Sequence, residues 1–284
     1  AFEIAFELGK SRVMLGQAAE GAAALRRAVE IDPRHALAKR ILARALETAG
    51  KPRDAIAAWR SVLEAEPDDA VANQRLGTLL AAEGKHEEAV APLEAAHAAL
   101  GDDVDLAIAL ASSYEALGRG GDAVPLLELA AKARPRDAAL HERLSAAHEA
   151  EGRFDEAAAA YEPVVQMRRR DAAAYLHLAK LHDAAKKPEA AQRALHEAYR
   201  LDPRSVPVIR AIAEMLHAGG RTEEAVQWLQ GACGMDPADV DARYLLAACY
   251  VALGRRAEAL VEYGVLCKQD AKTATKLYYL MGGR

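Results

Sequence analysis

The sequence predicts an all-α solenoid built from repeated pairs of helices. A leucine or isoleucine recurs every 34 residues, and a small residue follows each one. This ladder consists of Leu8, Leu42, Leu76, Leu110, Leu144, Leu178, Ile212 and Leu246. A second ladder, of small residues, keeps the same step: Gly21, Ala55, Ala89, Ala123, Ala157, Ala191, Ala225 and Ala259. Because neither ladder is interrupted by an insertion or deletion, the period indicates stacked repeats rather than one central core.

The composition agrees with this architecture. Aromatic residues make up only 5% of the 284 residues, whereas 52% are hydrophobic and many of these are alanine. Alanine favours helix and lets neighbouring helices approach closely. The net charge of -5 argues against a protein that covers nucleic acid, which usually carries a basic surplus. No apolar run is long enough for a transmembrane helix, so we expect no membrane insertion.

Each period predicts two antiparallel helices joined by a short turn. In residues 70–103 the apolar spacing predicts a helix up to Ala82, Gly84 ends it, and Glu87 opens the second helix. The same glycine recurs in every repeat except the sixth, which carries Lys186. The predicted repeats are 2–35, 36–69, 70–103, 104–137, 138–171, 172–205, 206–239 and 240–273, and residues 274–284 form a partial ninth repeat or a C-terminal cap.

The two ladders of small residues have a packing reason, because a large side chain would force two close helices apart. Larger side chains recur between them and are expected in the core: Leu25, Trp59, Leu93, Leu127, Tyr161, Leu195, Leu229 and Tyr263. One helix pair cannot bury its apolar face alone, so each repeat is stabilised by its neighbours.

The 34-residue length, both ladders and the proline that usually closes a repeat resemble the tetratricopeptide repeat over residues 2–273. The resemblance implies a right-handed superhelix whose concave face is lined by the first helix of each repeat. It also implies binding of peptides or protein segments on that face, and no enzymatic activity of the repeat itself.

An irregular joint is expected between the fifth and sixth repeats. Pro163 lies well inside a predicted second helix and should bend it, and residues 168–170, three arginines, replace the usual closing turn.

No catalytic or metal site is predicted, and no cofactor is expected. His148 and His182 occupy a repeat position that carries tyrosine elsewhere, which favours packing over metal binding. No serine or cysteine has a histidine and acid partner at helical spacing. Three cysteines near the C-terminus, two of them one repeat apart, are interpreted as reduced, buried packing residues. This cysteine usage points weakly to the cytoplasm, with the periplasm open if a signal peptide was removed.

The concave face is where partner binding is expected. By the family's pattern it presents basic, polar and apolar residues of the first helices: Phe6, Lys10, Arg40, Ile41, Arg44, Gln74, Arg75, Arg143, Leu176, His177, Lys180 and Arg210. Two interpretations remain open. Either this is a solvated face whose charges pair along one helix, as Arg44 with Glu47 and Lys180 with Asp183, or its arginines hold the carboxylates of an acidic and apolar partner segment. Charge reversal at Arg40 and Arg75 would then abolish binding without unfolding the array.

The function predicted first is a non-enzymatic scaffold that binds a partner protein segment. The alternatives are the substrate-recruiting arm of a larger enzyme, such as a glycosyl- or sulfo-transferase, and a bacterial envelope or secretion assembly factor. Apolar residues at both ends of the array, among them Leu280, indicate either self-association through the ends or a longer protein.

Overall fold

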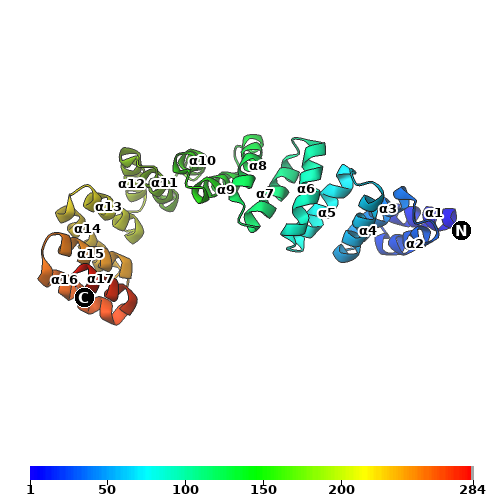
Figure 1. Cartoon of the computed structure of the whole chain (residues 1–284). Helices are drawn as coiled ribbons and strands as arrows, with labels where there is room; N and C mark the ends of the chain where they lie inside the picture. The colour runs from blue at the N-terminus through cyan, green and yellow to red at the C-terminus, as the bar shows by residue number, and fades with distance from the viewer. Residues whose placement is uncertain (283–284) are drawn as a thin grey trace. The chain divides into compact units, whose positions relative to one another are not determined.

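The computed structural model describes residues 1–282, and over this range the chain forms 17 helices and no strand (Figure 1). The odd-numbered first helices are α1 (Phe2–Met14), α3 (Ala36–Thr48), α5 (Ala70–Ala82), α7 (Val104–Ala116), α9 (Ala138–Ala150), α11 (Ala172–Ala184), α13 (Val206–Ala218), α15 (Val240–Ala252) and α17 (Ala271–Leu280). The second helices are α2 (Ala18–Ile31), α4 (Pro52–Ala65), α6 (His86–Leu100), α8 (Gly120–Ala133), α10 (Phe154–Met167), α12 (Pro188–Leu201), α14 (Thr222–Met235) and α16 (Arg256–Gln269). The all-α repeat solenoid is therefore confirmed.

The chain divides into two compact units between Glu151 and Gly152, in the turn that separates α9 from α10. The joint expected at residues 168–170 is instead a regular turn. The amide of Asp171 donates to the carbonyl of Arg168 at 2.9 Å, and the Asp171 carboxylate caps α11. A proline is therefore not needed to close this repeat, and α10 runs uninterrupted through Pro163.

Aspartates begin most of the first helices, a feature that the repeat pattern alone did not reveal. The Asp69 carboxylate accepts from the amides of Val71 and Ala72, at 3.0 and 3.2 Å. Equivalent caps come from Asp103, Asp137, Asp171, Asp239 and Asp270. Each carboxylate satisfies helix amides that otherwise lack an acceptor, so the caps fix where the helices begin.

The predicted ladders form the packing between helices. The ladder alanines from Ala43 to Ala259 are buried, and so are the large side chains between them, including Trp59, Leu93 and Leu229, except that Tyr263 near the C-terminal end is only half-buried. The leucine ladder is covered in the middle of the chain but not at its ends: Leu8 is 46% exposed and Leu280 48%. Residues 283–284 of the predicted partial ninth repeat lie outside the described residues, and α17 contributes its helical part.

Lys186 adopts a backbone conformation that every other repeat assigns to glycine. Its φ is 59°, whereas the equivalent glycines have φ between 67° and 79°. An L-residue in this left-handed region is strained by roughly 1 kcal/mol, because its Cβ approaches the following carbonyl. The turn between α11 and α12 is therefore under local strain.

We expect Lys186→Gly to raise the free energy of unfolding by about 1 kcal/mol by removing this strain. The measurement is urea-induced unfolding followed by the fluorescence of Trp228, in a chain whose other tryptophan, Trp59, is replaced by phenylalanine. Lys187→Gly is the matched control, since Lys187 is the next residue and has no positive φ. Stabilisation by both substitutions, or by neither, would contradict the strain interpretation.

Candidate partner-binding face

The odd-numbered helices share one outward surface within each unit. We call the first-helix face the surface formed, in every repeat, by the positions equivalent to Leu37, Arg40, Ile41, Arg44 and Glu47. Consecutive first helices contact one another directly; for example, α5 contacts α7, and α11 contacts α13. All twelve predicted partner-binding residues occupy these positions, but their side chains are in very different environments.

Two of the predicted apolar residues are buried rather than presented. Phe6 is 9% exposed and its ring lies 5.6 Å from Phe2 and 5.2 Å from His35. Leu176 is 8% exposed and belongs to the core that α10 to α13 share. These two side chains contribute packing beneath the face, whereas Ile41 is half-buried at its surface.

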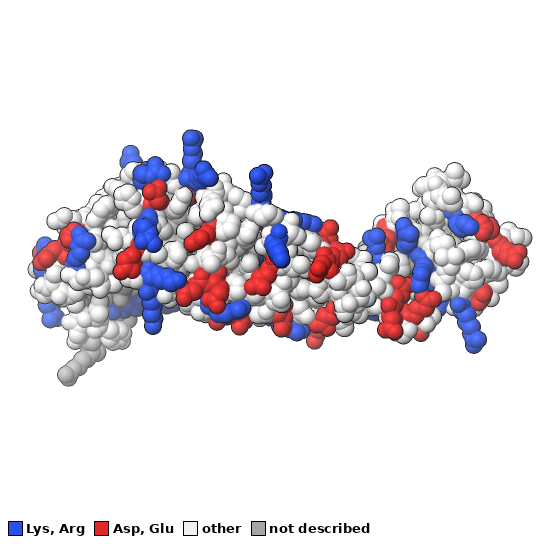
Figure 2. Space-filling model, turned by 90° about the horizontal axis from the view of Figure 1, so that it is seen from above, with Lys and Arg blue, Asp and Glu red and all other residues white. Residues whose placement is uncertain are grey.

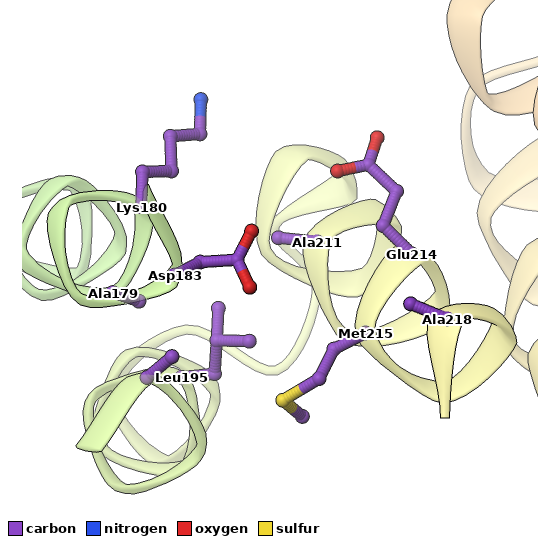
Figure 3. Close-up of a pocket in the computed structure, with 9 residues that line it drawn as sticks. Ala179, Lys180, Asp183, Leu195, Ala211, Glu214, Met215 and Ala218 are labelled. Carbon is purple, nitrogen blue, oxygen red and sulfur yellow. The ribbon is translucent and has the colours of Figure 1, made fainter. Parts of the chain in front are cut away.

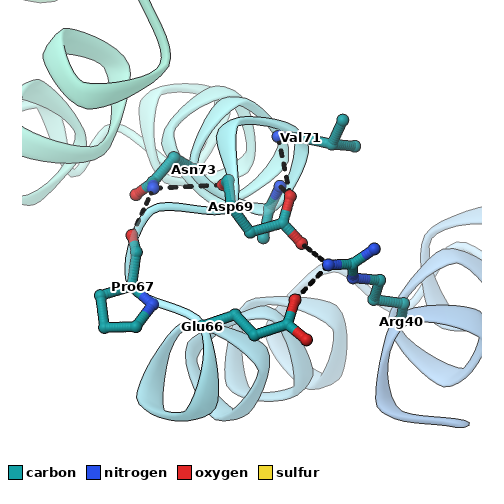
Figure 4. Close-up of polar contacts among 7 residues, drawn as sticks. Arg40, Glu66, Pro67, Asp69, Val71 and Asn73 are labelled. Atoms are coloured by element: carbon teal, nitrogen blue, oxygen red, sulfur yellow. Dashed lines mark hydrogen bonds and ion pairs between the residues drawn. The ribbon is translucent and has the colours of Figure 1, made fainter. Parts of the chain in front are cut away.

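Arg40 links the end of one repeat to the start of the next. Its guanidinium pairs with Glu66, in the turn after α4, and lies 2.7 Å from Asp69, the cap of α5 (Figure 4). Asn73, in the first turn of α5, donates to the carbonyls of Pro67 and Asp69, at 2.9 and 3.2 Å (Figure 4). Charge reversal at Arg40 would therefore break contacts within the stack, and it does not isolate partner binding as the sequence suggested.

Arginines at other repeats are also held by acids of a neighbouring repeat. Arg143 on α9 donates from Nε and Nη2 to the carboxylate of Glu115 on α7, at 2.7 to 3.1 Å, and to the Ser112 hydroxyl at 2.9 Å. Arg210 lies 3.3 Å from Asp239 and 3.1 Å from Asp241. We call the junction between consecutive first helices a seam, and these seams carry their own ion pairs.

Neither of the two ion pairs expected along single helices is present in residues 1–282. Glu47 accepts from the indole of Trp59 and lies 3.7 Å from Arg75 of the next repeat, so it is engaged without Arg44. Similarly, Lys180 and Asp183 form no ion pair with each other within the described residues. The helical spacing allowed both pairs, but Glu47 is instead engaged by side chains of α4 and α5.

Arg44 and Lys180 are the basic residues of the predicted set that remain exposed and make no ion pair in residues 1–282. Lys10 pairs with Glu7 at 3.0 Å, and the His177 ring packs edge-on against Tyr161 with 4.5 Å between centroids. Gln74 lies half-buried on α5.

Two apolar side chains that sequence reasoning missed lie on the same face as Arg44. Leu37 is 53% exposed and Val71 51%, and they are equivalent residues of consecutive repeats. Leu37, Ile41 and Arg44 are spaced four and three residues apart, which places them on one side of α3. This spacing could have identified Leu37 as part of the face. It was missed because the equivalent position in other repeats carries an acid: Glu3, Asp105 or Asp241.

The charged side chains are spread over the surface in both signs (Figure 2). Lysine and arginine side chains are interspersed with aspartate and glutamate over the face drawn in Figure 2. Within residues 1–282, no three His, Cys, Asp or Glu side chains are grouped as a metal site requires, and no helix has the length and apolarity to cross a bilayer.

Burial raises the pKa of the Cys233 and Cys249 thiols to about 11, which keeps them protonated. Cys267 is exposed, contrary to the expectation that all three cysteines are buried.

Comparison with solved structures places this architecture among known repeat proteins. YrrB, described as a TPR protein with an unusual peptide-binding site, is 22% identical over 67% of this chain and 98% of its own, with a TM-score of 0.53. A chain in the structure of Naa15/Naa10 bound to HypK-THB is 18% identical over 95% of this chain and 42% of its own, with a TM-score of 0.70. A MamA protein is 18% identical over 62% of this chain and 96% of its own, with a TM-score of 0.52. At these identities the likeness shows the fold alone.

Family models give a more specific result. Two models, both described as tetratricopeptide repeat, match residues 149–212 and 216–281, and residues 6–51, 42–103 and 108–174. No curated protein matches the chain. This repeat typically serves as a non-catalytic protein-interaction module. Because the matches extend over most of the sequence, the chain belongs to the tetratricopeptide repeat family.

Proposed function

We propose that the chain is a non-enzymatic scaffold that binds a segment of a partner protein along the first-helix face of α3 and α5. The observation that carries this proposal is the exposed apolar pair Leu37 and Val71 beside Arg44, which has no ion pair within the stack. Exposed apolar residues next to a free guanidinium favour a ligand that combines apolar side chains with a carboxylate.

The charges at this place favour an acidic segment. Arg75 is 53% exposed at the side chain and lies 3.7 Å from Glu47, so half of its surface remains available. Together, Arg44 and Arg75 outnumber the single carboxylate of Glu47 on this part of the face. A carboxylate held by an exposed arginine adds modest affinity and fixes orientation, while apolar contacts to Leu37 and Val71 supply burial.

The test begins with segments selected from a random peptide library displayed on phage and panned against the whole chain. We expect Arg44→Glu to weaken binding of the selected peptides about tenfold or more, because it turns an attraction for carboxylate into a repulsion. Fluorescence anisotropy titration of labelled peptides gives the dissociation constants.

The matched control is Arg27→Glu, which makes the same charge change at an exposed arginine of α2 that also has no ion pair with any of the described residues. Leu37→Ser provides an independent probe of the apolar contact. If the selected peptides bind equally to the parent, Arg44→Glu and Leu37→Ser chains, this face is not the binding surface and the proposal fails.

A further inference from the structure

A cavity of about 220 Å³ opens on the first-helix face between α11 and α13 (Figure 3). Its apolar lining includes Ala211, Met215 and Leu195, and the last of these comes from α12 beneath. The carboxylate of Asp183 extends from α11 toward the space in front of α13, and the Glu214 carboxylate lies across from it (Figure 3).

Comparison with two other seams explains why this space is empty. At the α7–α9 seam, Glu115 is held by Arg143, and at the α3–α5 seam, Glu47 faces Arg75. Asp183 is the residue equivalent to Glu115 and Glu47, separated from them by whole repeats. The residue equivalent to Arg143 and Arg75 is Ala211, so the acid is present here and its arginine is missing.

The same seam also carries an additional carboxylate. Glu214 stands where the other two seams have Ala146 and Thr78. Burial raises the pKa of Glu214, against the opposing effect of Arg210, which lies 3.9 Å away and is itself engaged by Asp239 and Asp241. The Glu214 side chain is 57% exposed, and the cation nearest to it is a guanidinium that two other carboxylates already engage.

Lys180 does not replace the missing arginine. It lines the cavity, but its side chain extends away from Asp183 (Figure 3), and it makes no ion pair within residues 1–282. The charged residues that line the cavity are two carboxylates, Asp183 and Glu214, and one ammonium, that of Lys180. One further positive charge would therefore make the lining neutral. Shape and charge therefore both match the group that the other seams supply from within the chain.

We propose that this cavity receives an arginine side chain of the partner segment, whose guanidinium binds between Asp183 and Glu214 while its methylene stem lies on Ala211 and Met215. The inference rests on the proposed function, since it names one residue of a bound partner segment. Arginine fits better than lysine because a planar guanidinium can engage two carboxylates at once, as Arg210 engages Asp239 and Asp241.

The probe is the blocked peptide acetyl-Ala-Ala-Arg-Ala-Ala-amide, with lysine and citrulline versions for comparison. Met215 is one of only five methionines, so ¹³C-methyl labelling of methionine in the whole chain reports on the cavity, and the other four methyl groups act as internal controls. Met215→Leu assigns its signal. We expect a saturable shift of the Met215 signal with the arginine peptide, and affinity about tenfold lower for the lysine peptide and lower still for the uncharged citrulline peptide.

Ala211→Arg should abolish the response, because it places in the cavity the arginine that the other seams already contain. Ala109→Arg is the matched control: it introduces the same side chain at the equivalent position of α7, where the residue equivalent to Asp183 is Ala81. Asp183→Asn with Glu214→Gln is a second variant that removes the charges with little change of volume, and it should lower the affinity at least tenfold.

An equal response to the arginine and citrulline peptides, an equal response to arginine and lysine, or a response that survives Ala211→Arg would overturn the inference. These outcomes are separable from failure of the proposed function. If Arg44→Glu abolishes binding of the selected segments but Met215 never responds to the arginine peptide, the scaffold function stands and the arginine site falls.

Discussion

Replacement of Glu262 by glutamine should lower the free energy of unfolding of the unit that begins at Gly152 by about 3 kcal/mol. Oε2 of Glu262 on α16 lies 2.7 Å from Nη1 of Arg243 on α15, and the two side chains are only 16% and 11% exposed. Glutamine keeps an amide oxygen that can accept from the guanidinium but carries no charge, so Arg243 is left in a poorly hydrated place with only neutral acceptors, this oxygen and the carbonyl of Pro237 at 2.9 Å. Breaking a buried pair costs more than the pair contributes, because one charge is left uncompensated.

The control is Glu258→Gln, on the same helix. Glu258 pairs with Arg255 at 2.8 Å, but both side chains are 43% exposed, and solvent screening makes such pairs nearly neutral in stability. Urea unfolding followed by Trp228 fluorescence, in the chain without Trp59, measures both variants. The double variant Arg243→Met with Glu262→Leu should recover most of the loss, since an apolar pair removes the isolated charge. Equal losses for Glu262→Gln and Glu258→Gln would show that burial is not the cause.

Gly77→Ala should destabilise the unit that ends at Glu151 by about 2 kcal/mol, although alanine is the better helix former. A Cβ at this position would lie 2.5 Å from Cγ of Leu93 and 3.2 Å from the carbonyl oxygen of Ala89. Leu93 is fully buried, so it cannot move aside without disturbing the α5–α6 packing. Overpacking therefore outweighs the gain of about 1 kcal/mol in helix propensity.

For Gly231→Ala we expect the opposite effect, an increase in stability. Gly231 lies inside α14, and a Cβ there meets no atom within 4 Å. Only the propensity difference acts, so the unfolding free energy should rise by about 1 kcal/mol. Trp59 fluorescence reports on Gly77→Ala, and Trp228 fluorescence reports on Gly231→Ala. Stabilisation by both substitutions would show that the close approach at Gly77 can relax.

The 34-residue ladders were sufficient to predict the helices because each ladder position has the same packing role in every repeat. Ala43 and Leu93 are buried for the reason that their positions suggest, and the turns follow from glycine and proline. The aspartate caps could also have been found, since a residue such as Asp69 immediately before a helical pattern is a standard N-terminal signal. Helices, turns and caps depend on residues that are close together in the sequence, so they can be predicted from the sequence alone.

The site was less predictable because it depends on contacts between helices of different repeats. The spacing on one helix allowed Glu47 to meet Arg44, yet Trp59 and Arg75 approach it from two other helices. Whether an arginine is free or engaged depends on residues 26 to 31 positions away, as for Arg40 with Glu66 and Arg143 with Ser112. The sequence predicted which positions form the face, but it could not distinguish the side chains held within the stack from those available to a partner.

The seam ion pairs also bear on how a chain of near-equivalent repeats finds its correct order during folding. Helices that share the same apolar ladder could dock onto the wrong neighbour at little cost in buried area, a known hazard of repeat arrays. A one-repeat slip would set Glu115 against His177 rather than Arg143, and it would leave Asp239 without Arg210. The junctions that carry such pairs are thus distinguished from one another by their charges, so these pairs favour the correct order of repeats even though each adds little stability.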